Sequence, residues 1–333
     1  MAVKRRMRMR IAGLILVAWA CLLGLSGKAL AQGVALDTVE RSGSGMVNWT
    51  EGWIQSTGLG APPEKSSGPG QARAMAQRAA YTVAVRNLLE AVKGVRVDSA
   101  TLVENYIVTN DVIKTQVSGF VRGAQVVKTD VQSDGGVEVT VRVPLWGADS
   151  LLNAFVAEKG LQSKDLPPES PAGEGATGLV IDARGLGVKP ACFPSVLDDK
   201  GQVVYGPEIV DKAEAEKNGM VQYRTLPKDA KISSLFGEDA YVIRPVQLSP
   251  MPREGRRPLK IKGAGKAGSL KANIMISSED AQKIRGDGQM KGALGRSRVV
   301  VVTDPLIGGM EGRAPDASPE AERLLAALPG ESR

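Results

Sequence analysis

The sequence predicts an α+β protein with two domains, and three features support this. An alanine-rich stretch at 71–93 has helical spacing, valines alternate along 137–143 as part of a hairpin with 125–131, and a Pro- and Glu-containing stretch at 164–178 is poor in apolar residues. The predicted order is a strand, a long helix, a second helix and a β-hairpin, then a second, mainly β (α+β) domain. The predicted segments are a signal peptide at 1–31, an α+β domain at 32–163, a linker at 164–178, a second domain at 179–305 and a flexible tail at 306–333.

The N-terminal segment has the features of a bacterial export signal. Five basic residues and no acidic residue precede an apolar run at 11–25, and the segment ends in the small-x-small pattern Ala29-Leu30-Ala31. The apolar run is shorter than the roughly 20 residues that a membrane span needs. We therefore expect cleavage after Ala31 and no transmembrane segment in the mature form, with an uncleaved anchor as the alternative.

Two cysteines lie on either side of the predicted cleavage site. Cys21 belongs to the leader, so the mature chain keeps only Cys192 and forms no internal disulfide. Lipid attachment at Cys21 is the alternative, but the bulky Trp19 and the continuing apolar run argue against it. Cys192 is predicted to be a small, buried apolar side chain.

The first domain is predicted to contain two helices. The alanine-rich first half of 71–93 favours a helix and lets a neighbouring element approach closely. Gly94 is the expected end of this helix, and a second helix is expected from about Thr101 to Gly119. The residues of the first helix that share one apolar face are Tyr81, Val85, Leu88, Leu89 and Val92.

The strands of the first domain are predicted from alternation and turn chemistry. One strand is expected through Trp53 and Ile54, after a flexible polar entry at 32–47 and before a loop at 57–70. A hairpin is expected from 125–131 and 137–143, with Asp134-Gly135-Gly136 as its turn.

The second domain is predicted to be rich in strands. Ser277 or Ser278 is expected to cap a short helix over 279–284, and the unbroken apolar run Val299–Val302 is expected to be buried on both faces. A turn at Asp198–Gly201 is expected to join two of the strands. The candidate strands are 179–183, 195–197, 203–205, 240–245, 259–262, 270–276 and 299–302.

The composition excludes several classes of function. The chain has no histidine, which rules out Ser-His-Asp triads, Cys-His pairs and imidazole zinc sites. It has 43 basic and 36 acidic residues, and removal of the leader's six basic residues leaves 37 against 36. A nearly neutral mature chain has no strong field to attract nucleic acid. We expect no cofactor and no metal.

Three motifs are candidates for a catalytic or ligand-binding site. The glycine string Gly263–Gly268 matches a dinucleotide-binding pattern, but strand-like alternation follows it, so a hairpin loop is the preferred interpretation. Asp182 and Arg184 follow a strand beside flexible glycines, as in a ligand-binding or catalytic loop, but the preferred interpretation is that they pair or cap at the strand end. Asp198 and Asp199 are adjacent in a turn, which suits solvent exposure better than acid–base catalysis. We therefore assign no catalytic, cofactor-binding or metal-binding residue.

The block 70–146 resembles the family of small outer-membrane lipoproteins that includes the flagellar basal-disc protein FlgP. The resemblance rests on the alanine-spaced helix through Leu89, the segment ending Val117-Ser118-Gly119, and the hairpin around Asp134-Gly135-Gly136. It implies a compact α+β module that oligomerises into envelope rings or discs and has no catalytic residues. The chain departs from this pattern in lacking a convincing lipid-attachment cysteine and in adding a second domain.

These observations lead to one expected function and one alternative. The expected function is that of a non-enzymatic structural protein of the periplasm, associated with the outer membrane, which binds itself or components of an envelope or flagellar assembly. The alternative is a periplasmic binding module for cell-wall glycan or a small envelope ligand, which uses the Gly-rich loops of the second domain and Trp49 or Trp53. Tryptophan suits a sugar platform, and burial of these two in the core is the other interpretation.

Overall fold

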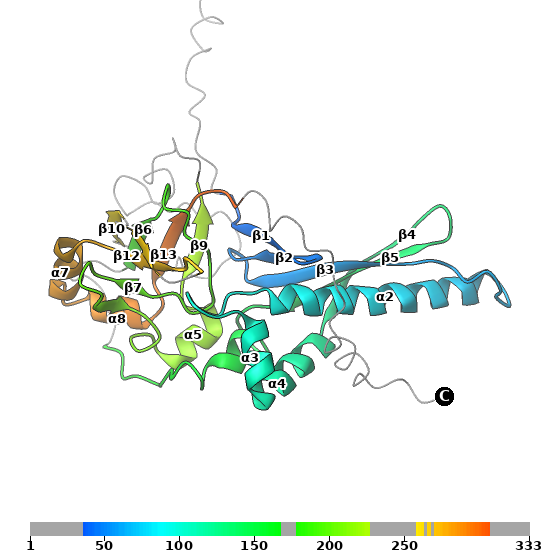
Figure 1. The fold of residues 1–333 in the computed structure, drawn as a ribbon, viewed down its shortest axis with the longest axis horizontal. Helices are drawn as coiled ribbons and strands as arrows, with labels where there is room; N and C mark the ends of the chain where they lie inside the picture. Colours follow the sequence, from blue (N-terminus) through cyan, green and yellow to red (C-terminus); the bar gives the residue numbers. More distant parts are fainter. Residues whose placement is uncertain (1–35, 168–177, 227–257, 263–264, 268–269, 307–333) are drawn as a thin grey trace, which may run out of the picture. The chain divides into compact units, whose positions relative to one another are not determined.

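The computed structural model describes residues 36–167, 178–226, 258–262, 265–267 and 270–306, which lie in one compact unit, Ala35–Arg333. The architecture is α+β in a two-domain arrangement, so the predicted fold class is confirmed (Figure 1). The predicted leader with Cys21, most of the predicted linker, the strand expected at 240–245 and the tail after Leu306 lie outside the described residues.

The first domain is built on a five-stranded antiparallel sheet with the order β1-β2-β3-β5-β4. The expectation of a flexible entry at 32–47 and a loop from residue 57 was wrong, because this part of the chain contributes three strands that hydrogen-bond in sequence. Burial of Val47 anchors the second of them. The strands are β1 (Val39–Ser42), β2 (Gly45–Asn48), β3 (Trp53–Gly60), β4 (Gln125–Val131) and β5 (Val137–Pro144).

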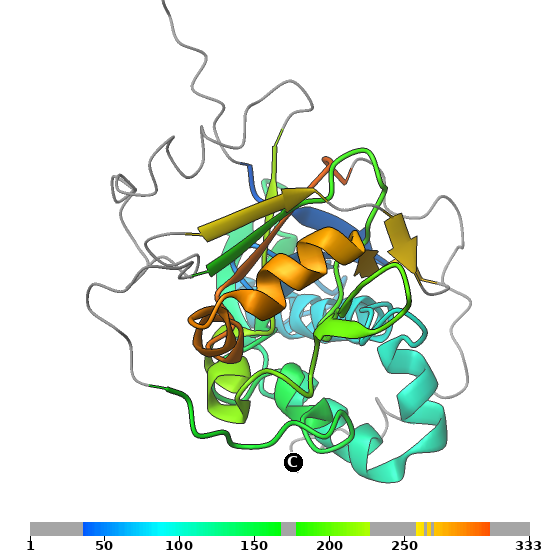
Figure 2. The ribbon, with the colours of Figure 1, turned by 90° about the vertical axis from the view of Figure 1, so that its left-hand side faces the viewer.

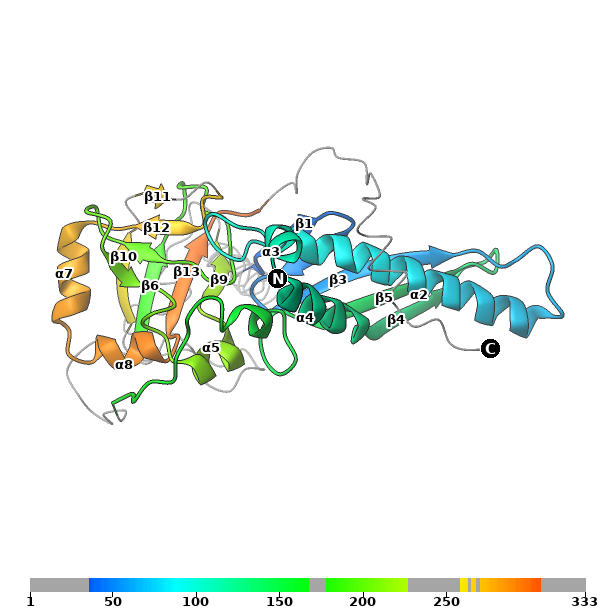
Figure 3. The ribbon, with the colours of Figure 1, turned by 60° about the horizontal axis from the view of Figure 1, so that its bottom comes forward.

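Helix α2 (Pro69–Lys93) lies along one face of this sheet (Figures 1 and 3). The alternating valines of β5 point to this face and are buried. On β3 the facing positions are Gly58 and Gly60, and a Cβ at Gly58 would lie 2.2 Å from the Ala84 N atom and 2.3 Å from the Ala80 O atom. Glycine on the strand and alanine on the helix therefore allow the two backbones to approach almost directly, as the alanine-rich sequence predicts.

The second predicted helix is two helices, α3 (Val103–Thr109) and α4 (Asp111–Arg122). Asn110 separates them in an extended conformation, and its side chain accepts the N–H groups of Val112 (3.0 Å) and Ile113 (3.2 Å). An asparagine N-cap thus starts a new helix where apolar spacing alone predicted a continuous one. The hairpin turn is as predicted: Gly135 has φ 84°, and the Asp134 carboxylate accepts the Gly136 N–H at 2.8 Å.

The second domain contains two four-stranded sheets. The first sheet is parallel throughout, with the order β10-β6-β13-β9, and the second has the order β11-β12-β7-β8. Its strands are β6 (Gly178–Asp182), β7 (Val196–Leu197), β8 (Val203–Tyr205), β9 (Gln222–Thr225), β10 (Pro258–Lys262), β11 (Gly265–Ala267), β12 (Asn273–Met275) and β13 (Val299–Thr303). Its helices are α5 (Lys212–Asn218), α7 (Ser278–Gly286) and α8 (Met290–Gly295), and α8 packs against β6 (Figure 2).

Several local predictions for the second domain are confirmed. Ser277 caps α7 by accepting the Asp280 N–H at 3.0 Å. The turn at 198–201 joins β7 to β8. Strand β13 is buried on both faces, because Val299 and Val301 join the main buried cluster whereas Val300 and Val302 belong to a second one. Helices α5 and α8 and strand β9 were not predicted.

The two domains share one apolar core. A single buried cluster includes residues of the α2-covered sheet and residues of the parallel sheet. Leu36 and Thr225 exchange backbone hydrogen bonds of 3.0 and 3.1 Å, so the start of the described chain lies beside the last residue of β9. Trp146 lies next to Gly52 of the first domain and Gly219 of the second, each of which has a positive φ. The domains are therefore packed together rather than joined only by a tether.

Candidate functional site

The two motifs with paired charges serve the fold. Arg184 donates from Nε and Nη2 to the two carboxylate oxygens of Asp182, at 2.8 Å each, as the sequence predicted. The N–H of the next residue, Gly185, donates to Asp304 at 2.7 Å, just after the end of β13. These contacts hold together the carboxyl ends of two adjacent parallel strands, β6 and β13.

Asp198 and Asp199 differ in their exposure. The expectation that both face solvent was wrong for Asp198, which is buried because its carboxylate organises the turn: it accepts the N–H groups of Lys200 (3.0 Å) and Gln202 (2.8 Å) and two hydrogen bonds from Arg285 (3.1 Å each). Burial acts to raise the pKa of Asp198, but these bonds outweigh it and lower the pKa. Asp199 is exposed and accepts the Ser278 hydroxyl and N–H, which links the turn to α7.

The tryptophans proposed as sugar platforms are occupied by protein contacts. Trp49 is 1% exposed and packs edge-on against Tyr223 of the second domain, with ring centroids 5.9 Å apart, so it belongs to the core and not to a binding surface. The Arg142 guanidinium lies 4.2 Å from the centroid of the Trp53 ring and covers one of its faces. The proposal of Trp49 as a platform was therefore wrong, because the second domain covers it.

A buried polar cluster joins the domains beside Trp49. The Arg96 guanidinium donates to the Pro190 carbonyl oxygen at 2.6 Å and pairs with Glu40, whose carboxylate also accepts the Trp49 Nε1–H at 3.2 Å. The Cys192 and Phe193 N–H groups donate back to the Arg96 (3.0 Å) and Val97 (2.8 Å) carbonyl oxygens. The sequence did not indicate this cluster, since its members come from three distant segments.

Cys192 is buried in the same region. Burial raises the pKa of its thiol to about 12, so the thiolate is scarce at neutral pH and the side chain is chemically inert. This agrees with the predicted role as a small buried apolar residue.

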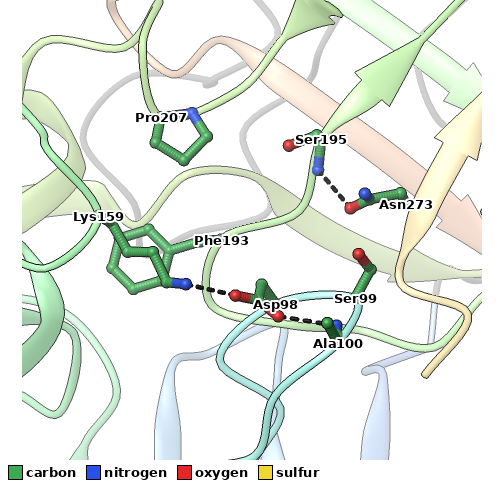
Figure 4. A pocket seen from close by; sticks show the side chains of 8 residues that line it. All are labelled: Asp98, Ser99, Ala100, Lys159, Phe193, Ser195, Pro207 and Asn273. Carbon is green, nitrogen blue, oxygen red and sulfur yellow. Dashed lines mark hydrogen bonds and ion pairs between the residues drawn. The ribbon is translucent and has the colours of Figure 1, made fainter. Parts of the chain in front are cut away.

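A cavity of about 250 Å³ lies between the domains near this cluster (Figure 4). Its lining combines a carboxylate, an ammonium group, two hydroxyls and an amide with apolar side chains. The lining residues are Asp98, Ser99, Ala100, Lys159, Phe193, Ser195, Pro207 and Asn273. The first four belong to the first domain and the others to the second, so the cavity exists only when the domains are together.

The charged residues of the cavity are fixed by their neighbours. Asp98 pairs with Lys159 and accepts the N–H groups of Ala100 (2.7 Å) and Thr101 (2.8 Å), while Lys159 also donates to the Tyr106 hydroxyl at 2.7 Å. Burial acts to raise the pKa of Asp98, but these bonds outweigh it and lower the pKa. Burial acts to lower the pKa of Lys159, and its two bonds outweigh this and raise the pKa.

Both groups of this pair therefore stay ionised at neutral pH. A general acid or base works best with a pKa near the operating pH, and the two shifts move these pKa values away from neutrality. The arrangement suits the binding of a polar molecule better than proton transfer. Ser195, whose N–H donates to Asn273 at 2.9 Å, adds a hydroxyl to the wall (Figure 4).

Exposed apolar side chains are concentrated in the first domain. Of the large apolar side chains that are exposed in the described residues, all but Val203 precede the end of β4. They include three valines of β4, at the edge of the sheet, and two valines at the junction of α3 and α4. The members in the first domain are Leu36, Met46, Leu59, Met75, Val83, Val108, Val112, Val126, Val127 and Val131.

Residues 178–305 match a family model described as the second domain of Treponema pallidum Tp0624. This part of the chain is thus similar to that domain, and the match runs over nearly the same residues as the predicted second domain. No curated protein matches the chain. None of the helices in the described ranges has the length and apolar character that crossing a bilayer requires.

Proposed function

We propose that the protein is a non-enzymatic structural component of the periplasm or outer membrane that self-associates or joins a larger envelope assembly, such as a flagellar-motor ring or disc. The observations that carry this proposal are the exposed large apolar side chains of the first domain and the outer edge of β4, which pairs with no other strand among the described residues. Exposed apolar patches and open sheet edges are typical of association surfaces. The predicted leader and the FlgP-like character of 70–146 supply the location and the kind of assembly.

Light scattering of the protein without residues 1–31 tests the proposal. We expect concentration-dependent oligomers, and we expect Val112→Asp combined with Val131→Asp to weaken them, because both substitutions place a charge on the apolar surface of the first domain. Val203→Asp, on the second domain, is the matched control and leaves association unchanged. Strictly monomeric behaviour at high concentration, together with no partner captured by crosslinking in cells, contradicts the proposal.

A second candidate function rests on the cavity between the domains. Its hydroxyls, amide and ion pair fit a small polar ligand of the envelope, such as a soluble cell-wall glycan fragment. Calorimetric titration with muropeptides tests this: Ala100→Trp, which places an indole in the cavity, abolishes the heat of binding, whereas Thr115→Trp on the exposed surface of α4 preserves it. Equal heats of binding for the two variants, or no heat of binding with the wild-type protein, would contradict ligand binding in the cavity.

A further inference from the structure

Strand β4 is the last strand of its sheet, and among the described residues nothing pairs with its outer edge. Gln132, directly after β4, donates its N–H to Gly136 on the β5 side at 2.7 Å. Backbone groups alternate in direction along an antiparallel strand, so those of Asp130 point to β5 and those of Thr129 and Val131 point outward. This edge is therefore open to another strand.

The side chains of β4 divide between the two faces of the sheet. Lys128 lies opposite Thr140 and Asp130 opposite Glu138, on the face away from α2. Thr129 lies opposite Val139, on the face that carries α2. Lys128 and Asp130 form an exposed ion pair with each other, with 2.5 Å between Nζ and Oδ2. Their side chains are thus available to a strand that adds to the edge.

The segment Val127–Val131 reads apolar, basic, polar, acidic, apolar, which makes it complementary to itself in the antiparallel direction. We propose that two copies of this protein pair β4 to β4, antiparallel, about a twofold axis at Thr129. Each Lys128 then lies opposite the partner's Asp130, and each Val131 opposite the partner's Val127. This inference rests on the proposed self-association and names the surface that performs it.

Charge selects this register over its neighbours. An axis at Lys128 places two lysines opposite each other, and an axis at Asp130 places two aspartates opposite each other, which opposes pairing. With the axis at Thr129, every charge on the strand faces an opposite one. Val127 and Val131, which are 45% and 50% exposed in one copy, both lose solvent on pairing.

A charge exchange between copies tests the register. Lys128→Asp gives two acidic residues on the strand and Asp130→Lys gives two basic ones, so we expect each variant alone to lose the dimer in sedimentation at low salt. An equimolar mixture of the two variants forms a heterodimer, and the double exchange in one chain restores the homodimer. Because the mixture recovers pairing, it also shows that both variants are folded.

A disulfide at the axis provides an independent test. Cα atoms of a hydrogen-bonded antiparallel pair lie about 5.5 Å apart, which is within the range of a disulfide. We expect Thr129→Cys to form a covalent dimer on mild oxidation, whereas Thr115→Cys on α4 does not, and the buried Cys192 does not interfere. An oligomer that ignores the charge exchange and lacks the Thr129→Cys crosslink overturns the β4 pairing but leaves self-association standing. A protein that is monomeric throughout overturns both.

Discussion

At the scale of residues, the buried Arg96 makes polar contacts within the first domain and across to the second. Its side chain is 8% exposed and that of its partner Glu40 is 14% exposed, so both charges are removed from most of the solvent. A buried charge is stable only while its partner and its hydrogen bonds remain. The hydrogen bonds of Arg96 to the Pro190 carbonyl oxygen and from the Cys192 N–H cross to the second domain, so a displacement of the domains would break them.

Replacement of Arg96 by Met is expected to lower the free energy of unfolding by about 3–5 kcal/mol, because it leaves Glu40 buried without its cation. Urea denaturation followed by tryptophan fluorescence measures the change. The double variant Arg96→Met/Glu40→Gln recovers part of the loss, since it also removes the stranded charge. A loss below about 1 kcal/mol in the single variant would show that the pair is solvated.

The ion pair in the cavity gives a prediction of pH dependence. The lowered pKa of Asp98 adds stability above its ordinary value of 3.8, which is lost as the pH falls through the lowered value. The raised pKa of Lys159 adds stability below its ordinary value of 10.5, which is lost as the pH rises through the raised value. We therefore expect wild type to be more stable than Lys159→Met by about 1–3 kcal/mol between about pH 5 and pH 10, with a smaller difference outside this window.

Unfolding free energies measured across this range check the prediction. Lys283→Met is the control, because Lys283 pairs with Glu279 on the exposed surface of α7, where solvent screens the pair, so its loss is expected to change the stability less than Lys159→Met at every pH. A difference for Lys159→Met that does not vary with pH would indicate lost packing of the lysine stem instead.

At the scale of elements, the contact of α2 with β3 depends on the absence of side chains at Gly58 and Gly60. A Cβ at Gly60 would lie 2.0 Å from the Ala76 O atom. The atoms that a Cβ at Gly58 or Gly60 would meet belong to the backbone of α2, which cannot move aside locally. The helix would have to shift as a whole, and the valines beneath it would lose contact.

Gly58→Ala is therefore expected to destabilise the protein by about 3 kcal/mol or more, the upper end of the cost of overpacking a core. Gly119→Ala is the matched control: Gly119 is exposed within α4, a Cβ there meets nothing within 4 Å, and the substitution should stabilise by about 0.5–1 kcal/mol. Thermal and urea unfolding of the two variants check both signs. A neutral Gly58→Ala would mean that α2 is free to move off the sheet.

Elements with strong local signals could be predicted from the sequence, and those that depend on distant partners could not. The hairpin of β4 and β5, the cap of α7 and the double-sided burial of β13 follow from nearby residues. Strands β1 and β2 were missed because their polar sequence becomes a strand only by pairing with β3. The parallel order of the second domain was missed because β6 pairs with β13, about 120 residues further along the chain.

The same distinction applies to the candidate sites. The pairing of Asp182 with Arg184 was predicted, since the two residues are only two positions apart in the chain. The cavity was not predicted, because Asp98 and Lys159 are 61 positions apart and the rest of its wall comes from the second domain. Neither Asp98 nor Lys159 belongs to a sequence motif, so no local pattern indicates such a site.

At the scale of the whole molecule, the shared core predicts that the domains unfold together. The described tryptophans, Trp49, Trp53 and Trp146, all lie in the first domain, whereas far-UV circular dichroism reports on both. We expect the two signals to give coincident urea transitions in the wild type. Arg96→Met should separate them, because it removes a contact between the domains. Two distinct transitions in the wild type would contradict the shared core.

Trp146 sets a joint constraint on two positions that are far apart in the sequence. A Cβ at Gly52 would lie 2.3 Å from its Cε2 atom, and one at Gly219 would lie 2.9 Å from its Cε3 atom. A single indole thus forbids any larger residue at both sites, one in each domain. A smaller side chain at position 146 would relieve both clashes at once, whereas the positive φ of the two glycines, 75° and 73°, would still disfavour alanine. The three positions are therefore coupled through one ring.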